Sequence, residues 1–174
     1  MARDILRFLR LPAAAAILLA AGPASAQVTT VLVVRHAEKA SPTAKDPHLS
    51  AAGKLRAKDL AHAAGAAGVT AIYATNFQRT QETVAPLAAA LHLTPIVKNA
   101  DLTEELVAEI KTTRQGQTVL VCGHSDTVPD IVKRLSGVVV DPIPDTRFDG
   151  LYVVTLSQAE AGRATRVRYG KPTP

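Results

Sequence analysis

Short apolar segments alternate with longer, mixed segments along most of the chain. Six segments are rich in Val, Ile, Leu or Thr and short enough to be strands, at residues 28–34, 71–74, 95–98, 118–122, 151–156 and 165–169. Four segments have the composition of helices, at residues 51–65, 77–91, 103–114 and 128–135. This alternation predicts a three-layer α/β/α sandwich around a mostly parallel central sheet, with the last two strands antiparallel.

Polar residues mark the starts of two of these helices. Ser50 is placed to cap the first helix, and Thr75 or Asn76 the second. Pro129 falls in the first turn of the fourth helix, where its missing N–H costs no hydrogen bond. The segment 138–150, rich in Pro and Asp, is expected to be a loop.

The first 26 residues have a different pattern from the rest. Three arginines within the first ten residues precede an apolar stretch, 11–22, and a run of small residues at 24–26. This order is typical of a secretory signal peptide, cut near Ala26, that leaves one domain of residues 27–174. The apolar stretch is too short to span a bilayer comfortably, and a retained N-terminal anchor is the alternative. We therefore expect a periplasmic or secreted protein without stable membrane insertion after cleavage.

The net charge of the chain limits the classes of partner that can be expected. The net charge is +5, and loss of residues 1–26, with three Arg and one Asp, lowers it to +3. No run of five basic residues is present, and three Tyr and three Phe offer few stacking surfaces, so nucleic acid is not an expected partner. A small anionic substrate suits this balance better. The oligomeric state stays unknown at this level.

Cationic and imidazole side chains follow three of the predicted parallel strands. Arg35 and His36 follow the first strand, Arg79 lies in the first turn of the helix after the second, and His124 follows the strand at 118–122. The carboxyl ends of parallel strands meet at one edge of a sheet, so these side chains should lie together. Guanidinium groups and helix N-termini both suit phosphate oxygens. The sequence therefore predicts a phosphate or sulfate site.

Three ordered motifs resemble those of the histidine phosphatase superfamily, in its smaller, phosphoglycerate-mutase-like branch. They are Arg35–His36–Ala37–Glu38, residues 75–83 (TNFQRTQET) and Gly123–His124–Ser125, with residues 49–53 (LSAAG) as a further match. The resemblance covers essentially all of residues 27–174, and Ala37 stands where the family commonly has Gly. It implies the phosphoglycerate-mutase-like fold and a phosphomonoester hydrolase that needs no metal or other cofactor. It also implies that His36 becomes phosphorylated while Arg35, Arg79 and His124 hold the phosphate.

General chemistry is consistent with these implied roles. A neutral imidazole attacks phosphorus through one nitrogen when a hydrogen bond to the other nitrogen selects the tautomer. We expect Arg35, Arg79 and a protonated His124 to stabilise the charge on the phosphoryl oxygens.

The acid that protonates the leaving group is not clearly marked. Asp126, two residues after His124, is one candidate, and Glu104, in a Leu-x-Glu setting where the family often places a Glu, is the other. Each also has a structural interpretation, because Asp126 suits a helix N-terminus and residues 101–104 fit a capping box. Glu38 is a weaker third candidate, better suited to positioning Arg35 or its loop.

Three alternatives remain open at this level. A metal hydrolase would use His36, His48, His124, Glu38, Asp46 and Asp126. Their spacing matches no compact ligand motif, and the two arginines would repel a cation. A mutase would need a cap to protect the phosphohistidine from water, and the connections between the motifs are short. An exported phospho-ligand binding protein would have the same pocket with little turnover.

Overall fold

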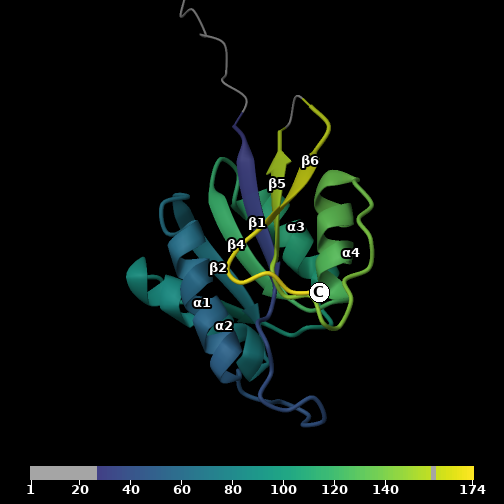
Figure 1. The fold of residues 1–174 in the computed structure, drawn as a ribbon. Helices are drawn as coiled ribbons and strands as arrows, with labels where there is room; N and C mark the ends of the chain where they lie inside the picture. The colour runs from purple at the N-terminus through teal and green to yellow at the C-terminus, as the bar shows by residue number, and fades with distance from the viewer. Residues whose placement is uncertain (1–26, 158–159) are drawn as a thin grey trace, which may run out of the picture.

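A mixed sheet of six strands forms the centre of the molecule (Figure 1). The computed structural model describes residues 27–157 and 160–174, so the predicted signal peptide, residues 1–26, lies outside the described residues. Within these ranges the elements are β1 (Thr29–Arg35), α1 (Ala51–Ala64), β2 (Val69–Thr75), α2 (Gln78–Ala90), β3 (Ile96–Lys98), α3 (Thr103–Thr113), β4 (Thr118–Gly123), α4 (Thr127–Ser136), β5 (Gly150–Leu156) and β6 (Arg163–Arg168).

The strand order is β3-β2-β4-β1-β5-β6. The first four strands of this order are parallel to their neighbours, whereas β5 pairs antiparallel with β1 and β6 pairs antiparallel with β5. The prediction of a mostly parallel sheet with a final antiparallel pair is therefore confirmed. β1 and β4 lie side by side in the middle, with Arg35 opposite Gly123 at their carboxyl ends.

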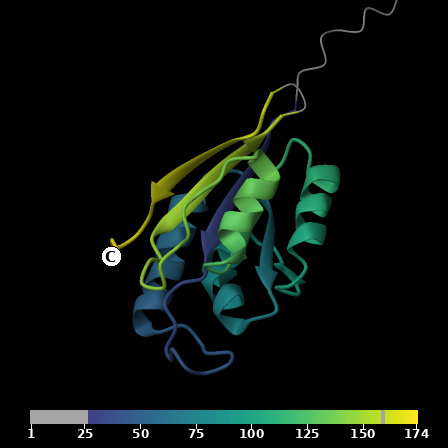
Figure 2. The ribbon, with the colours of Figure 1, turned by 90° about the vertical axis from the view of Figure 1, so that its right-hand side faces the viewer.

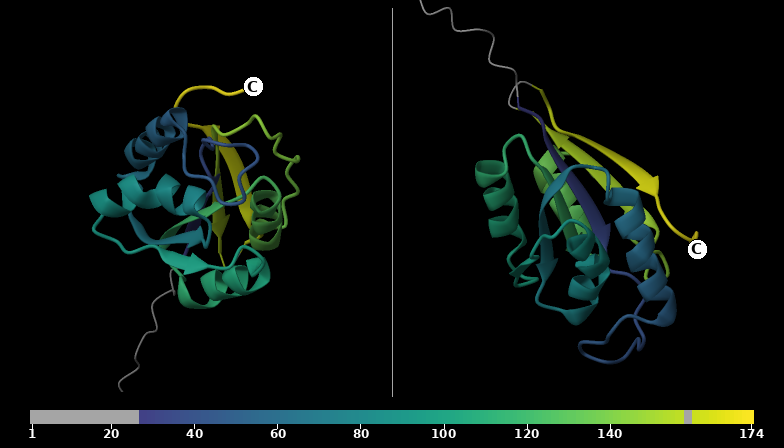
Figure 3. Two further views of the ribbon diagram at one scale, coloured as in Figure 1. Left: turned by 90° about the horizontal axis from the view of Figure 1, so that it is seen from below. Right: turned by 90° about the vertical axis from the view of Figure 1, so that its left-hand side faces the viewer.

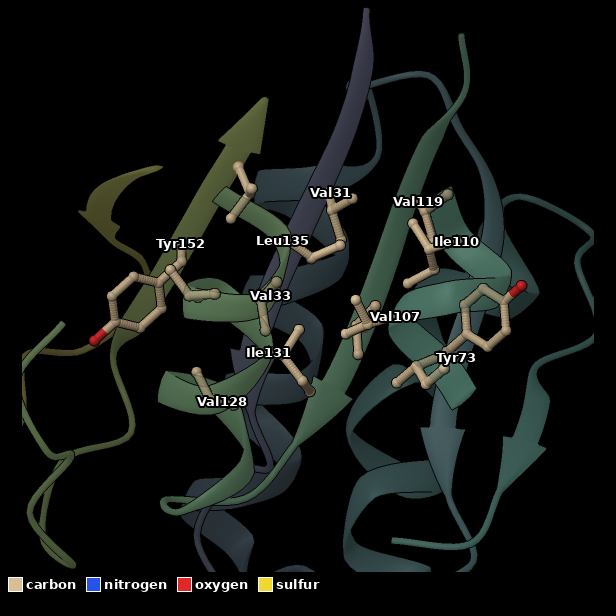
Figure 4. Packing of buried hydrophobic residues seen from close by; sticks show 14 of the residues in the cluster. Val31, Val33, Tyr73, Val107, Ile110, Val119, Val128, Ile131, Leu135 and Tyr152 are labelled. Atoms are coloured by element: carbon tan, nitrogen blue, oxygen red, sulfur yellow. The ribbon is translucent and has the colours of Figure 1, made fainter. Parts of the chain in front are cut away.

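Helices cover both faces of the sheet, as the views in Figures 2 and 3 show. Along β1, Val31 and Val33 belong to the core beneath α3 and α4, whereas Leu32 and Val34 belong to the core beneath α1 and α2. In Figure 4, Val33 lies beside Ile131 of α4. Strand residues alternate between faces, and burial of each such apolar side chain contributes about 1.5–3 kcal/mol, so both layers hold β1 in place.

The predicted N-cap of α1 is confirmed, whereas neither predicted N-cap of α2 is. Ser50 Oγ accepts a hydrogen bond from the Gly53 N–H at 3.0 Å, as expected of a helix cap. The N-cap of α2 is Phe77, whose side chain makes no capping bond. Thr75 is instead the last residue of β2, and the Asn76 side chain accepts from the Ala100 N–H.

The capping box predicted over residues 101–104 is also wrong. The N-cap of α3 is Leu102, and the helix has no side-chain cap. Asp101 therefore lies before the helix without capping it. None of the helices in the described ranges combines the length and the apolar character needed to cross a bilayer.

Candidate functional site

A cavity of about 420 Å³ lies where β1, β2 and β4 end. Its lining includes Arg35, His36, Phe77, Arg79, His124 and Asp126. The ring centroids of His36 and His124 are 5.4 Å apart, so one phosphate can contact both imidazoles. The strand register explains this closeness, because the His36 N–H donates to the Gly123 carbonyl and extends the β1–β4 pairing to the two histidines. The structure thus brings together the four residues that the sequence placed at one edge.

His36 is held in one tautomer by its own loop. The ring is 3% exposed, and its Nδ1 lies 2.7 Å from the carbonyl oxygen of Ala37. A carbonyl only accepts hydrogen bonds, so Nδ1 carries the proton. Burial lowers the pKa of His36 to about 3, with Arg35, His124 and Arg79 lowering it further and the Ala37 carbonyl opposing them. The imidazole is therefore neutral near pH 7, and its Nε2 has a free lone pair.

His124 is bound on both ring nitrogens. Arg79 Nη2 lies 3.4 Å from Nδ1, and Thr75 Oγ1 lies 3.1 Å from Nε2. The guanidinium can only donate, so Nδ1 accepts and Nε2–H donates to the threonine. Burial and then Arg79 lower the pKa of His124 to about 4, with Asp126 acting in the opposite direction. The protein's own charges therefore favour a neutral His124 and do not support the expected protonated form, which needs the negative charge of a phosphate.

Arg79 lies in the first turn of α2, where the sequence placed it. Its guanidinium carbon lies 4.2 Å from the centre of the Phe77 ring, and Nη1 is 3.8 Å from Asp46 Oδ1. The same carboxylate oxygen accepts from the Gln78 N–H at 2.9 Å. Burial lowers the pKa of Arg79, although a guanidinium stays charged. Its Nε is buried and has no hydrogen-bond partner among the described residues.

Arg35 is fastened to the loop between α4 and β5. Nη1 donates to the carbonyl oxygens of Pro144, Asp145 and Arg147 at 2.8, 3.2 and 3.0 Å. The guanidinium carbon lies 4.3 Å from the centre of the Phe148 ring. Within the described part of the chain, its buried Nε also has no partner. Both arginines line the cavity, and each has a buried Nε without a partner among the described residues.

Asp126 lies at the cavity, and it also starts a helix. Its exposed side chain is part of the cavity lining and accepts from the Thr127 N–H at 2.9 Å as the N-cap of α4. Both sequence interpretations of Asp126 are thus compatible with its position. Asp101 lines the same cavity, although the sequence indicated only a cap there.

Glu104 and Glu38 are placed away from acid chemistry at this cavity. Glu104 is 83% exposed, lies 3.9 Å from Arg134 of α4 and is not part of the lining. Glu38 binds Arg56 of α1 with contacts of 2.8 and 3.0 Å. The Arg56 guanidinium also donates to the carbonyl oxygens of Tyr169 and Lys171. Glu38 therefore ties the loop after Arg35 to α1 through Arg56, which agrees with the expectation for the loop, and Arg56 itself holds the C-terminal segment.

The residues of the metal interpretation do not converge. His48 bonds to Glu82, Glu38 bonds to Arg56, and Asp46 accepts from the α2 backbone. Across residues 27–157 and 160–174, no group of three or more His, Cys, Asp or Glu side chains is placed to hold a metal ion. These six residues are thus not arranged as a metal site.

Sequence reasoning missed several residues that shape the site. Thr75 and Thr83 lie within the second motif, yet nothing in their spacing showed that they contact His124 and the Ala37 N–H. Asp46 and Phe148 lie in loops, which have no periodicity from which a contact could be predicted. Only the Pro- and Asp-rich composition of 138–150 drew attention to the loop that holds Arg35.

Comparison with known proteins gives the same picture. The model of the histidine phosphatase superfamily (branch 1) matches residues 31–106, a range that includes Arg35, His36 and Arg79. No curated protein matches. A structure of the protein histidine phosphatase SixA in complex with tungstate is similar, with a TM-score of 0.62, 19% identity, and coverage of 80% of this chain and 96% of that one.

A mycobacterial glucosyl-3-phosphoglycerate phosphatase is similar too, with a TM-score of 0.66, 12% identity, and coverage of 82% of this chain and 98% of that one. At these identities the two structures establish the fold. Residues 31–106, which carry the first two motifs, match the model of the histidine phosphatase superfamily, so this part of the chain is similar to that family.

Proposed function

We propose that this protein is a phosphomonoester hydrolase that acts through a phosphohistidine on His36. The observation that carries the proposal is the hydrogen bond from His36 Nδ1 to the Ala37 carbonyl, which leaves Nε2 as the nucleophilic nitrogen in a cavity lined by two arginines. A neutral nucleophile needs no deprotonation, and the lowered pKa of His36 keeps it neutral from mildly acidic to alkaline pH.

Two transfers complete the reaction. In the first, Nε2 attacks phosphorus, the bond from phosphorus to the leaving oxygen breaks, and that oxygen takes a proton from an acid. The ring becomes a phosphorylated imidazolium, whose Nδ1–H still donates to the Ala37 carbonyl. In the second, water attacks phosphorus and gives a proton to the conjugate base of that acid, the P–N bond breaks, and phosphate, neutral His36 and the acid are restored. Arg35 and Arg79 stabilise the phosphoryl oxygens in both transfers, and His124 does so once the negative charge of the bound phosphate has protonated it.

Hydrolysis is favoured over phosphoryl return to substrate. The longest connections between described elements are residues 36–50 and 137–149, and neither forms a helical cap over the cavity. Water therefore has access to a phosphohistidine. A second cavity of about 330 Å³ shares Arg35, Lys39 and Asp145 with the first and gives a small leaving group room. The structural relatives in complex with tungstate and with VO3 support phosphate as the ligand class.

We also propose that the protein acts outside the cytoplasm, as the pattern of residues 1–26 predicts. The first strand residue is Thr29, so a cut after Ala26 leaves every described element intact. Sequencing the N-terminus of the protein from a periplasmic fraction tests this, with Gln27 as the expected first residue. Met1 at the start of the exported protein would contradict cleavage.

The test of the activity compares His36→Ala with His62→Ala, a change on the exposed surface of α1. With nitrophenyl phosphate, His36→Ala should lose at least about 10³-fold in kcat, because no neighbouring group replaces the nucleophile. Arg79→Ala should lower kcat and also weaken inhibition by orthophosphate, since the guanidinium serves bound substrate and transition state alike. His62→Ala should match the wild type in both measurements.

Trapping of the intermediate separates the proposal from its alternatives. Wild-type protein quenched with labelled substrate should carry acid-labile, alkali-stable phosphate, and His36→Ala should carry none. Wild-type turnover in His36→Ala would refute the mechanism. Tight orthophosphate binding without turnover, even of nitrophenyl phosphate, would indicate a binding protein. Transfer of the label to a second alcohol in place of water would indicate a mutase.

A further inference from the structure

Thr83, on the second turn of α2, connects the loop of His36 to the turn that carries Arg79. Its side chain is fully buried, and its Oγ1 bonds to two backbone groups and also contacts the Cys122 thiol. It accepts from the Ala37 N–H at 2.9 Å and donates to the Arg79 carbonyl at 2.6 Å. The hydroxyl proton is committed to the Arg79 carbonyl, so its lone pairs are available to Ala37.

Ala37 is thereby held on both sides. Its N–H is bound by Thr83, and its carbonyl receives the His36 Nδ1–H. The carbonyl selects the tautomer of His36 only while its direction is fixed. Gly53 packs against the next residue, since a Cβ there would lie 2.2 Å from the Glu38 carbonyl oxygen, so the loop has support from α1 as well. Thr83 links the Ala37 backbone to the turn of Arg79.

We propose that Thr83 is a positioning residue, which holds the Ala37 backbone so that His36 keeps its Nδ1–H tautomer and its Nε2 stays in register with the phosphate held by Arg79. The role in catalysis rests on the proposed function. The alternative is a structural role alone, since a threonine that bonds back to the carbonyl four residues earlier is common in helices. Thr112 makes that same bond to the Ala108 carbonyl on the exposed surface of α3.

The test uses Thr83→Val, which keeps the shape and removes both hydrogen bonds, and Thr83→Ser, which keeps both. Thr112→Val is the matched control, because it removes an equivalent helix bond away from the cavity. Four properties are measured: the tautomer of His36, from the ¹⁵N shifts of its ring nitrogens, kcat with nitrophenyl phosphate, the inhibition constant of orthophosphate, and the melting temperature. Thr83→Ala repeats the comparison if the valine variant does not fold.

In Thr83→Val we expect mixed tautomers of His36 and a kcat reduced about 10- to 100-fold, because a small misplacement of a nucleophile has effects of this size. The inhibition constant of orthophosphate should change less than about threefold, since both arginines remain. Thr83→Ser should restore the single tautomer and most of kcat. Thr112→Val should match the wild type in every measurement.

A lower melting temperature in Thr83→Val with the wild-type tautomer and kcat would overturn the proposal in favour of a structural role. Loss of kcat with the tautomer unchanged, or mixed tautomers with kcat unchanged, would overturn it too. A wild-type protein without turnover would refute the proposed function, and the tautomer spectra would still decide whether Thr83 positions His36.

Discussion

In single side chains of this site, some nitrogen atoms form hydrogen bonds with the protein and others do not. His36 uses Nδ1 and keeps Nε2, and Arg35 uses Nη1 and keeps Nε without a protein partner in the described chain. Arg35, His36 and His124 could be predicted because they lie at the carboxyl ends of buried strands, and Arg79 because it lies in the first turn of the helix after such a strand. The partners that aim them, such as Phe148, lie in loops and could not be predicted from a period.

The structure reduces the number of candidates for the acid that protonates the leaving group. Asp126 and Asp101 line the cavity, whereas Glu104 does not. An alkoxide leaving group needs a proton as its bond to phosphorus breaks, and nitrophenolate does not. We expect Asp126→Asn to lower kcat/KM for an alkyl phosphate by about 10²-fold or more while nitrophenyl phosphate changes little. Steady-state rates with the two substrates measure this.

Asn is also a good N-cap, so Asp126→Asn should keep its melting temperature. Glu104→Gln is the matched control, with no leaving-group dependence expected from a side chain that is 83% exposed and close to Arg134. Asp101→Asn takes the place of Asp126→Asn as the informative variant if the latter slows both substrates equally. Selective loss in Glu104→Gln would contradict the placement of the acid.

The helices follow the hydrophobic pattern, whereas one helix start depends on a distant residue. The predicted ranges of all four helices agree with the structure to within one residue at each end. The capping contact of α2 could not be predicted, because its Gln78 N–H is bound by Asp46, 32 positions earlier in the chain. The two local candidates do not cap the helix, because Thr75 bonds to the Thr80 side chain and the Phe77 N–H, and Asn76 accepts from the Ala100 N–H. A capping residue that is distant in sequence gives no signal in the residues next to the helix.

Asp46→Ala should therefore affect both the stability of α2 and the phosphate site. Loss of a capping bond costs about 1 kcal/mol of unfolding free energy. The same change removes the carboxylate 3.8 Å from Arg79 Nη1, so the guanidinium loses one of its supports. We expect weaker inhibition by orthophosphate, by up to about fivefold, since an exposed ion pair contributes up to about 1 kcal/mol. Urea unfolding and inhibition constants check the two effects.

Asp46→Asn separates the cap from the charge. An amide oxygen still accepts from the Gln78 N–H, so stability should be retained. Any remaining loss of orthophosphate inhibition then belongs to the missing charge beside Arg79. Unchanged stability in Asp46→Ala would show that this carboxylate does not cap α2 in solution.

Across the whole molecule, the order of the strands creates the site. The alternation of strands and helices could be predicted, and so could the final antiparallel pair. The order β3-β2-β4-β1-β5-β6 could not, because neighbours such as β1 and β4 are far apart in sequence. That pairing is what sets His36 and His124 level at one edge. Two buried imidazoles beside two guanidinium groups make the stability of the fold depend on pH.

Acid should destabilise the whole fold through His36 and His124. Their folded-state pKa values are lowered to about 3 and about 4, and an unfolded histidine titrates near 6.5. Above pH 6.5 both states are neutral and the two residues contribute nothing to the pH dependence. Between pH 6.5 and about 4 only the unfolded state takes up the protons, so the stability present at neutral pH is lost as the pH falls. We expect a loss of about 2–4 kcal/mol between pH 7 and pH 5.

Urea unfolding at a series of pH values in phosphate-free buffers measures this loss. The double variant His36→Asn/His124→Gln replaces each ring with an amide that donates near Nδ1 or Nε2 and does not titrate. Its unfolding free energy should depend less steeply on pH than that of the wild type between pH 7 and pH 5. His62→Asn, on the exposed surface of α1, should keep the wild-type slope. An equal slope in the double variant would mean that the two imidazoles are not held neutral by the fold.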